Sequence, residues 1–172
     1  MGKERWGSLT SSDELLELYL ATEIYFLNAE GETCKTGTFT ESAGQSGQTV
    51  MSVVDSTYVD AWVITANNPR SQQIEETANL AYNLALGWDL AREGFATELV
   101  TCSSPDGTWS EDSFLVFGKT EQESQRLARV IRDLAVKYGQ NAVFRFVGQE
   151  QQIVPVLDLR TQGARRYSVQ RV

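Results

Sequence analysis

The sequence predicts an α+β fold, a single-domain sandwich in which two main helices cover a mixed or mainly antiparallel sheet. Its 172 residues suit one ordinary domain with a real core. Two long segments have helical periodicity, and short runs of β-branched and aromatic residues separate them. These runs follow the helices in pairs, which is typical of an α+β sandwich.

We expect the domain to cover residues 1–158 and a basic C-terminal tail to cover 159–172. Within the domain, residues 1–11 are expected to be a loose leader. Residues 28–48 are rich in Gly, Ser and Thr, which predicts a flexible loop that could act as a lid. Residues 34–40 could add an edge strand to this loop.

The first expected helix is short. Ser11 and Glu14 have the spacing of a capping box, so the helix should run from about Ser12 to Leu20. The apolar run 24–27 then predicts a strand.

The middle of the chain predicts a buried strand followed by a long helix. Residues 58–66 are rich in aromatic and β-branched side chains, and the proline of Asn68-Pro69 ends the strand because it has no N–H to donate. We expect Ser71 to cap the helix and Gly94 to end it. Leucines on more than one side predict a deeply packed helix. Its expected buried stripe is Ile74, Ala78, Ala81, Ala85 and Trp88.

The last third of the chain predicts one more helix between pairs of strands. Thr120 and Glu123 again have capping-box spacing, and Gly139 should end the helix. A turn is expected around Pro105-Asp106-Gly107. The expected strands are 95–102, 114–117, 142–147 and 152–157, and residues 148–151 should join the last two as a hairpin.

Charge and composition exclude several classes of function. A net charge of −8 disfavours general nucleic-acid binding. No apolar run is long enough to span a membrane and no secretory signal is visible, so we expect a cytoplasmic protein. With no histidine and two cysteines, the chain lacks a histidine-dependent serine triad, a histidine-containing zinc site and a disulfide framework. We expect no cofactor, and a homo-oligomer remains open.

Three polar motifs lie at the joints between expected elements. We call residues 64–71 the first motif, 105–114 the second motif and 139–142 the third motif. Side chains at such joints can converge at one edge of a sheet, where ligands often bind. The motifs offer amides, carboxylates, hydroxyls, one guanidinium and one indole. They therefore predict a site that recognises something polar.

The first motif carries groups suited to a nucleotide-like ligand. The amides of Asn67 and Asn68 can pair with the edge of a base, and Arg70 could clamp a phosphate. The free amides after Ser71 could add anion binding. The alternative is that this motif only shapes a turn. Asn79, one helical turn before Asn83, could reach these loops or bond to the backbone of a neighbouring strand.

The second motif holds the candidate catalytic groups. Two of the carboxylates Asp106, Glu111 and Asp112 could act as acid and base or hold Mg²⁺, although Asp106-Gly107 is also ordinary turn chemistry. Trp109 could stack on a base or anchor the loop on the core.

The third motif follows the glycine that ends the last helix. The amides of Gln140 and Asn141 could point into the same pocket as Asn68 or satisfy loop backbone groups.

The motif string resembles a bacterial and phage family of domains of unknown function, numbered 3293. The family pattern is Ile-Thr-Ala-x-Asn-Pro-x-Ser, Asp-Gly-x-Trp-x-Glu-x-Ser-Phe and Gly-Gln-Asn-Ala, in that order over about residues 19–157. The matching positions are Thr65, Asn68, Pro69, Ser71, Asn79, Asp106, Gly107, Trp109, Glu111, Ser113, Gly139, Gln140, Asn141 and Ala142. This chain departs from the family pattern at Asn67, where the pattern usually has tryptophan. Its 28–48 loop is also longer than is typical of the family. The resemblance implies a fold and a residue pattern but no activity.

Three functional hypotheses follow. The first is a non-catalytic binding module for a small, nucleotide-like ligand, such as a phage protein that sequesters a bacterial defence signal in an infected cell. The second is a hydrolytic or metal-assisted enzyme that uses Glu111 with Asp106 or Asp112. The third is an acidic protein-binding inhibitor, for which the scattered acidic residues are a weak basis.

Overall fold

The computed structural model describes residues 12–28, 30–36, 57–148, 150–157 and 167–168. The expectations for the leader, for the Ser11 cap, for most of the 28–48 loop and for most of the basic tail lie outside the described residues.

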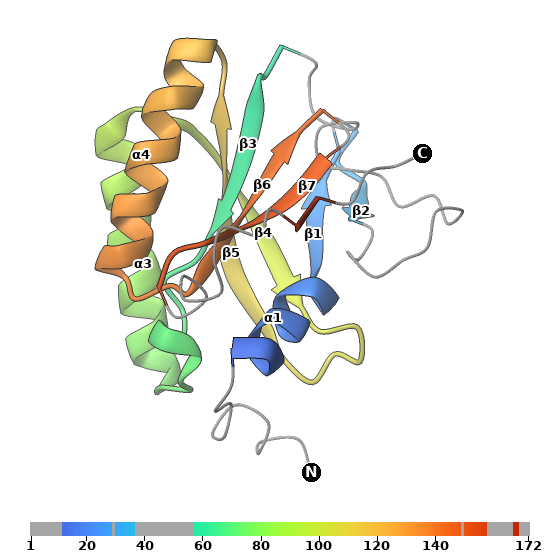
Figure 1. Ribbon diagram of the computed structural model, residues 1–172. Helices are drawn as coiled ribbons and strands as arrows, with labels where there is room; N and C mark the ends of the chain where they lie inside the picture. The colour runs from blue at the N-terminus through green and yellow to red at the C-terminus, as the bar shows by residue number, and fades with distance from the viewer. Residues whose placement is uncertain (1–11, 29, 37–56, 149, 158–166, 169–172) are drawn as a thin grey trace.

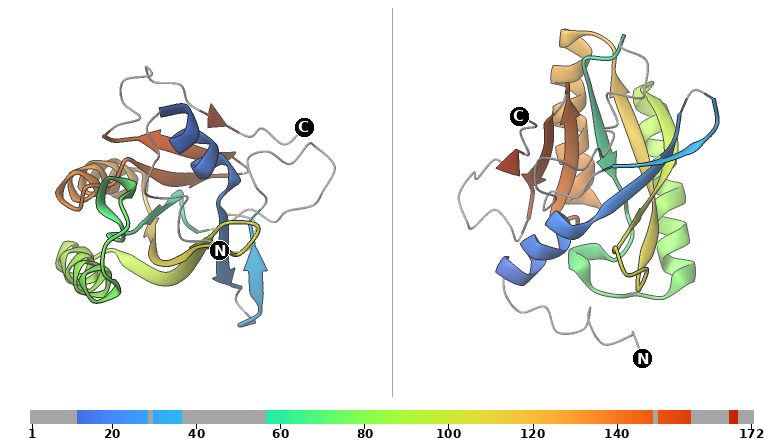
Figure 2. Two further views of the ribbon diagram at one scale, coloured as in Figure 1. Left: turned by 90° about the horizontal axis from the view of Figure 1, so that it is seen from below. Right: turned by 90° about the vertical axis from the view of Figure 1, so that its right-hand side faces the viewer.

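An antiparallel sheet forms the centre of the fold (Figure 1). Among the described residues it has eight strands in the order β2-β1-β4-β5-β3-β6-β7-β8. Every pairing in it is antiparallel, and Figure 2 shows that the sheet is strongly curled. The strands are β1 Glu23–Leu27, β2 Thr33–Lys35, β3 Asp60–Ile64, β4 Ala96–Ser103, β5 Ser110–Gly118, β6 Ala142–Val147, β7 Glu150–Pro155 and β8 Tyr167–Ser168.

Two helices cover one face of the sheet, as predicted, and a third covers the other. Helices α3 (Glu76–Glu93) and α4 (Glu121–Lys137) lie side by side, while α1 (Ser12–Ala21) packs against the opposite face (Figures 1 and 2). A 3-10 turn, η1, covers Pro69–Ser71. The α+β expectation is confirmed. No helix in the described part of the chain is both long and apolar enough to cross a membrane.

Strand β3 shows how the two faces of the sheet are filled. All five of its residues are buried, and successive side chains point to opposite faces. Ala61 and Val63 join the core layer beneath α1, whereas Trp62 and Ile64 join the layer beneath α3 and α4. The prediction of a buried strand in this segment is therefore confirmed.

A buried ion pair lies at the start of β3. Asp60 is fully buried, and its Oδ2 accepts hydrogen bonds from Trp62 Nε1 and Arg145 Nε, both at 3.0 Å. Nη2 of Arg145 lies 2.9 Å from the same oxygen. In β5, a Cβ at Gly118 would lie 2.6 Å from Asp60 Oδ1, so the ion pair requires glycine at this position.

The predicted cap of the long helix is wrong. Helix α3 begins at Glu76 rather than after Ser71, and Glu75 is its N-cap residue without a side-chain cap. Ser71 has a φ of 56°, in the left-handed region, and its Oγ accepts a hydrogen bond from Asn141 Nδ2 at 3.1 Å. Ser71 therefore joins two loops instead of starting a helix.

The predicted buried stripe of α3 is also wrong. The buried residues are Asn83, Leu86 and Leu90, while Trp88 is 69 % exposed. Only one face of α3 meets the sheet, and a Cβ at Gly87 would lie 3.0 Å from the Phe114 ring. The close contact between Gly87 and Phe114 and the hydrogen bonds of the Asn83 amide orient the helix. Neither feature can be predicted from the spacing of apolar residues. The outer leucines Leu80 and Leu84 remain exposed.

Strand β5 is longer than predicted. It begins at Ser110 rather than near Phe114, so Glu111 and Ser113 belong to the strand and not to the preceding turn. Residues two apart on a strand share a face. Glu111 and Ser113 consequently face the same side of the sheet as Leu115, which lies in the core layer beneath α1.

Candidate functional site

The first and third motifs are joined by backbone and side-chain hydrogen bonds. The N–H of Arg70 donates to the carbonyl oxygen of Gly139 at 2.6 Å, and Gln140 Nε2 donates to the carbonyl oxygen of Asn67 at 3.0 Å. Two loops that are far apart in the sequence therefore form one corner of the molecule.

The second motif meets the same corner. Thr65 Oγ1 and Asn83 Nδ2 each donate to the carbonyl oxygen of Asp112 at 2.9 Å. A side-chain hydrogen bond also links Asn68 to Glu111. All three polar motifs thus converge at one end of the sheet.

Two asparagines of α3 hold the first motif in place. Asn83 Oδ1 accepts from the N–H of Ala66 at 2.8 Å, and its Nδ2 donates to Asn67 Oδ1 at 2.8 Å. Asn79 Oδ1 accepts from the N–H of Asn68 at 2.7 Å, and its Nδ2 donates to Asn68 Oδ1 at 3.0 Å. Of the two readings of Asn79, the geometry favours the one in which it reaches the motif loops, because Asn68 lies beyond the end of β3 and belongs to no strand.

The first motif stores backbone strain. Asn68, Arg70 and Ser71 have φ values of 46°, 55° and 56°, in the left-handed region that side chains other than glycine rarely adopt. Each such residue costs about 1–2 kcal/mol. The hydrogen bonds from α3 and from the third motif sustain this conformation. Strain of this kind clusters at functional sites.

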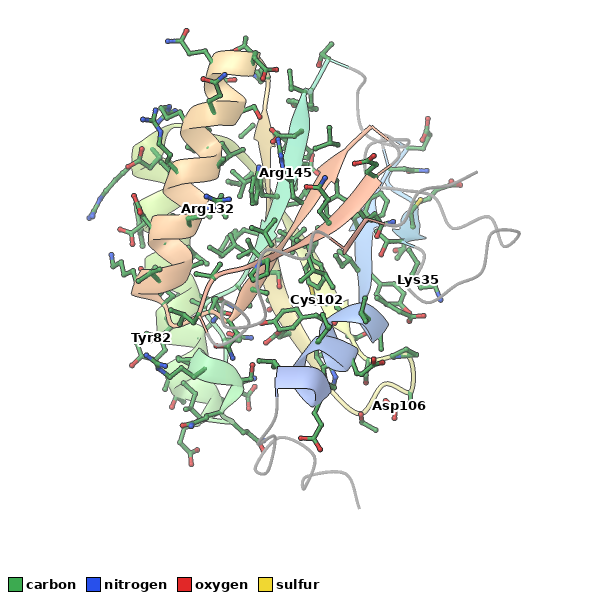
Figure 3. All side chains as sticks on the ribbon, viewed as in Figure 1. Lys35, Tyr82, Cys102, Asp106, Arg132 and Arg145 are labelled. Carbon is green, nitrogen blue, oxygen red and sulfur yellow. The ribbon has the colours of Figure 1, made fainter. Side chains whose placement is uncertain are left out.

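A pocket opens between α1 and this end of the sheet. We call it the α1 pocket. Side chains of α1 line one wall, β3 to β6 line the base, and the first and third motifs line the rim. Its cavity volume is about 40 Å³. Cys102, which Figure 3 labels near α1, lies within it.

Six of the predicted ligand-binding residues line the α1 pocket, and four do not. The lining residues among them are Asn67, Asn68, Ser71, Trp109, Glu111 and Gln140. The residues outside the lining are Arg70, Asn79, Asp106 and Asn141.

Each residue outside the lining has another setting. Asp106 lies on an exposed turn (Figure 3), where its Oδ1 accepts from the N–H of Thr108 at 3.1 Å. Arg70 is exposed, and Asn141 is buried against Ser71. Asp112, the other acid of the second motif, is exposed and also lies outside the lining.

The structure adds pocket residues that sequence reasoning did not select. Four such residues line the α1 pocket: Tyr19 of α1, Cys102 of β4, Thr65 of the first motif and Ser113 of the second motif. The Glu111–Ser113 spacing is a usable signal, because two polar residues two apart on a strand share a face. No sequence pattern indicates that Tyr19 lines the pocket, because the packing of α1 against the sheet is a long-range contact.

Glu111 is the carboxylate of the α1 pocket. Burial raises its pKa from 4.5 to about 8, and the hydrogen bond from Asn68 opposes that rise. Among the described residues that line the pocket, none is Lys or Arg. Without a cation to favour the charged form, Glu111 is mostly protonated at neutral pH.

The neighbouring titratable groups stay neutral. Burial, followed by the charge of Glu111, raises the pKa of Tyr19, although the N–H of Ala142 donates to the tyrosine oxygen at 3.3 Å. Burial raises the pKa of Cys102 to about 12. Because the thiolate is the reactive form, this cysteine is not suited to be a nucleophile at neutral pH.

The chemistry of the α1 pocket is that of hydrogen-bond recognition with one exchangeable proton. The described residues contain no group of three or more Cys, Asp or Glu side chains placed to hold a metal ion. Glu111 can donate a hydrogen bond when protonated and accept two or more when ionised.

Gly139 should be the least replaceable residue of the third motif. It shares a φ of 68° with Gly107, but an added Cβ would lie 3.0 Å from Pro69 Cβ at Gly139 and would meet nothing within 4 Å at Gly107. We expect Gly107→Ala to cost about 1 kcal/mol of backbone strain and Gly139→Ala about 1–2 kcal/mol more. Urea unfolding of both variants measures the difference. Equal losses would show that the first and third motifs are not in close contact.

Comparison with known proteins adds a family. The family model described as Protein of unknown function (DUF3293) matches residues 64–143, which supports the family expected from the motifs. The matched residues run from the end of β3 into β6 and include all three motifs. No curated protein and no solved structure matches the chain.

Proposed function

Since the DUF3293 match covers all three motifs and carries no activity, we propose from the pocket itself that this chain is a non-catalytic binding module for a small polar ligand. The observation that carries this proposal is the convergence of the three motifs, through direct hydrogen bonds, on the α1 pocket. Backbone strain in the first motif supports it, because the surrounding structure sustains a costly conformation at the pocket rim.

The size and polarity of the α1 pocket narrow the proposal of a nucleotide-like ligand. A cavity of about 40 Å³ is roughly three times the minimum for one water molecule, so only a head group would enter it. Arg70, the expected phosphate clamp, lies outside the lining. We therefore propose that a nitrogen-bearing edge of the ligand, rather than a phosphate, enters the pocket.

The test is a ¹H–¹⁵N NMR titration with adenine, adenosine and AMP. We expect the indole resonance of Trp109 to shift and that of Trp88 to stay, because Trp88 is exposed on the outer face of α3. AMP should bind no more tightly than adenosine. Binding should also raise thermal stability, by about 2.7 kcal/mol at 100 times the Kd. A shift of Trp88 alone would place binding elsewhere.

One observation favours a second candidate function. A carboxyl group that is protonated at neutral pH is a possible general acid, and Glu111 has that property. Asp106 and Asp112 lie outside the α1 pocket, so Glu111 would act without the second carboxylate that a two-carboxylate hydrolase uses. An enzyme of this kind predicts turnover that Glu111→Gln abolishes, whereas a binding module predicts none in either protein.

A further inference from the structure

Glu111, which is partly buried, differs from the buried acids Asp60 and Glu23 in having no cation beside it among the described residues. Asp60 pairs with Arg145 at 2.9 Å, and buried Glu23 pairs with Lys35 at 2.7 Å. Buried carboxylates in folded proteins are normally paired in this way. The described lining of the α1 pocket contains neither Lys nor Arg. A cationic partner for Glu111 is thus absent from the described residues of the pocket.

The α1 pocket also offers hydrogen-bond acceptors to a donor. Gln140 uses its Nε2 to donate to the carbonyl oxygens of Asn67 at 3.0 Å and Tyr138 at 3.3 Å, which turns its Oε1 to other donors. Glu111 has two carboxyl oxygens that can accept hydrogen bonds, and the side chain of Asn68 donates one of these bonds. A ligand group rich in N–H donors satisfies such a site.

Aromatic rings complete the surroundings of Glu111. Tyr19, Trp109 and Phe144 line the α1 pocket, and the rings of Tyr19 and Phe144 are 5.7 Å apart. Aromatic faces attract cations, and cages of this composition recognise ammonium groups. The protein uses the same attraction at Phe95, where the guanidinium carbon of Arg126 lies 4.0 Å from the ring centroid.

We propose that the head group that enters the α1 pocket is a protonated amine, which donates its N–H groups to Glu111 and Gln140 between the aromatic rings. This inference rests on the proposed binding function and names the chemical class of its ligand. The cavity volume of about 40 Å³ suits a primary ammonium group on a slender chain.

Binding of an amine should depend on pH in a defined direction. The titratable groups that face Glu111 are Tyr19 on α1 and Cys102 on β4, and burial raises the pKa of both. Glu111 alone titrates near neutrality, at about pH 8. An ammonium ligand requires Glu111 in its ionised form, so binding below pH 8 releases the proton of Glu111. Affinity should rise about tenfold for each pH unit up to 8 and then level off.

The experiment is an NMR titration of the Trp109 indole with n-butylammonium and with 1-butanol, its uncharged counterpart, at pH 6.5 and 8.5. We expect n-butylammonium to bind at least ten times more tightly than 1-butanol, and more tightly at pH 8.5. In Glu111→Gln the affinity for n-butylammonium should fall at least tenfold and lose its pH dependence. Glu98→Gln, at an exposed site on β4, is the matched control and should behave as the parent chain.

The outcomes separate this inference from the proposed function. Equal binding of n-butylammonium and 1-butanol would overturn the inference that the ligand is an amine, and so would an affinity that does not rise with pH in the parent chain. Either result would leave the proposed binding function standing. Binding of adenine without n-butylammonium has the same consequence. If none of these compounds shifts Trp109, both the amine and the proposed binding function fail.

Discussion

Glu111→Gln should make the protein more stable than the parent chain above pH 8 while leaving its stability near pH 4 almost unchanged. The folded-state pKa of Glu111 is about 8, above its ordinary value of 4.5. Between these values the folded chain holds a proton that the unfolded chain has released. The stability contributed by this proton is complete below pH 4.5 and is lost as the pH rises through 8. Glutamine mimics the protonated form at every pH.

The size of the effect follows from the same two values. At about 1.4 kcal/mol for each pH unit, the interval from 4.5 to 8 corresponds to roughly 5 kcal/mol. Since the side chain of Glu111 is partly exposed, we expect about 3 kcal/mol. Urea unfolding from pH 4 to 9 measures it, with Glu98→Gln as the exposed control. If the stabilities of the parent chain and of Glu111→Gln change in parallel as the pH rises, the Glu111 carboxyl group is solvated in the folded protein.

Arg145→Met should be the most destabilising of the arginine replacements, at about 3–5 kcal/mol. The variant leaves Asp60 fully buried without its cation, and Trp62 Nε1 is the other donor to its Oδ2. Unfolding in urea at pH 7 gives the loss directly. A loss below about 1 kcal/mol would mean that water reaches Asp60 in the folded protein.

Arg126→Met is the matched control for this prediction. Arg126 also pairs with a carboxylate, at 3.1 Å from Glu93, and also lies over an aromatic ring. The side chain of Glu93 is 43 % exposed, whereas that of Asp60 is 0 % exposed, so water can replace one arginine and not the other. We expect Arg126→Met to cost less than about 1 kcal/mol. Adding Asp60→Asn to Arg145→Met should restore part of the lost stability, because it removes the uncompensated charge.

Most strands of the sheet were predictable from the sequence because they are locally encoded. The buried run around β3 and the hairpin of β6 and β7 follow from apolar patterning and turn residues. The orientation of α3 was not predictable from the sequence. The exposed residues Leu80, Leu84 and Trp88 fit the helical period as closely as the residues that are buried. Contact at Gly87 and the hydrogen bonds of Asn83 select the buried face, and both depend on partners distant in the sequence.

The candidate site was predictable to the extent that its residues lie in the three motifs. Glu111, Asn68 and Gln140 could be selected from the sequence because polar residues at strand ends are rarely there for packing. Tyr19 could not, since a tyrosine in an amphipathic helix is an ordinary core residue until the position of that helix is known. Arg70 illustrates the opposite error, because a residue of suitable chemistry in a motif can still point away from the pocket.

The α1 wall of the pocket has an evolutionary consequence. Residues 64–143, which match the family model, supply the rim and most of the base, whereas α1 lies outside that match and contributes Tyr19. Helix α1 pairs with no strand, so its side chains can change without altering the register of the sheet. We expect members of the family to share one scaffold and to diverge in what they recognise through this exchangeable helix.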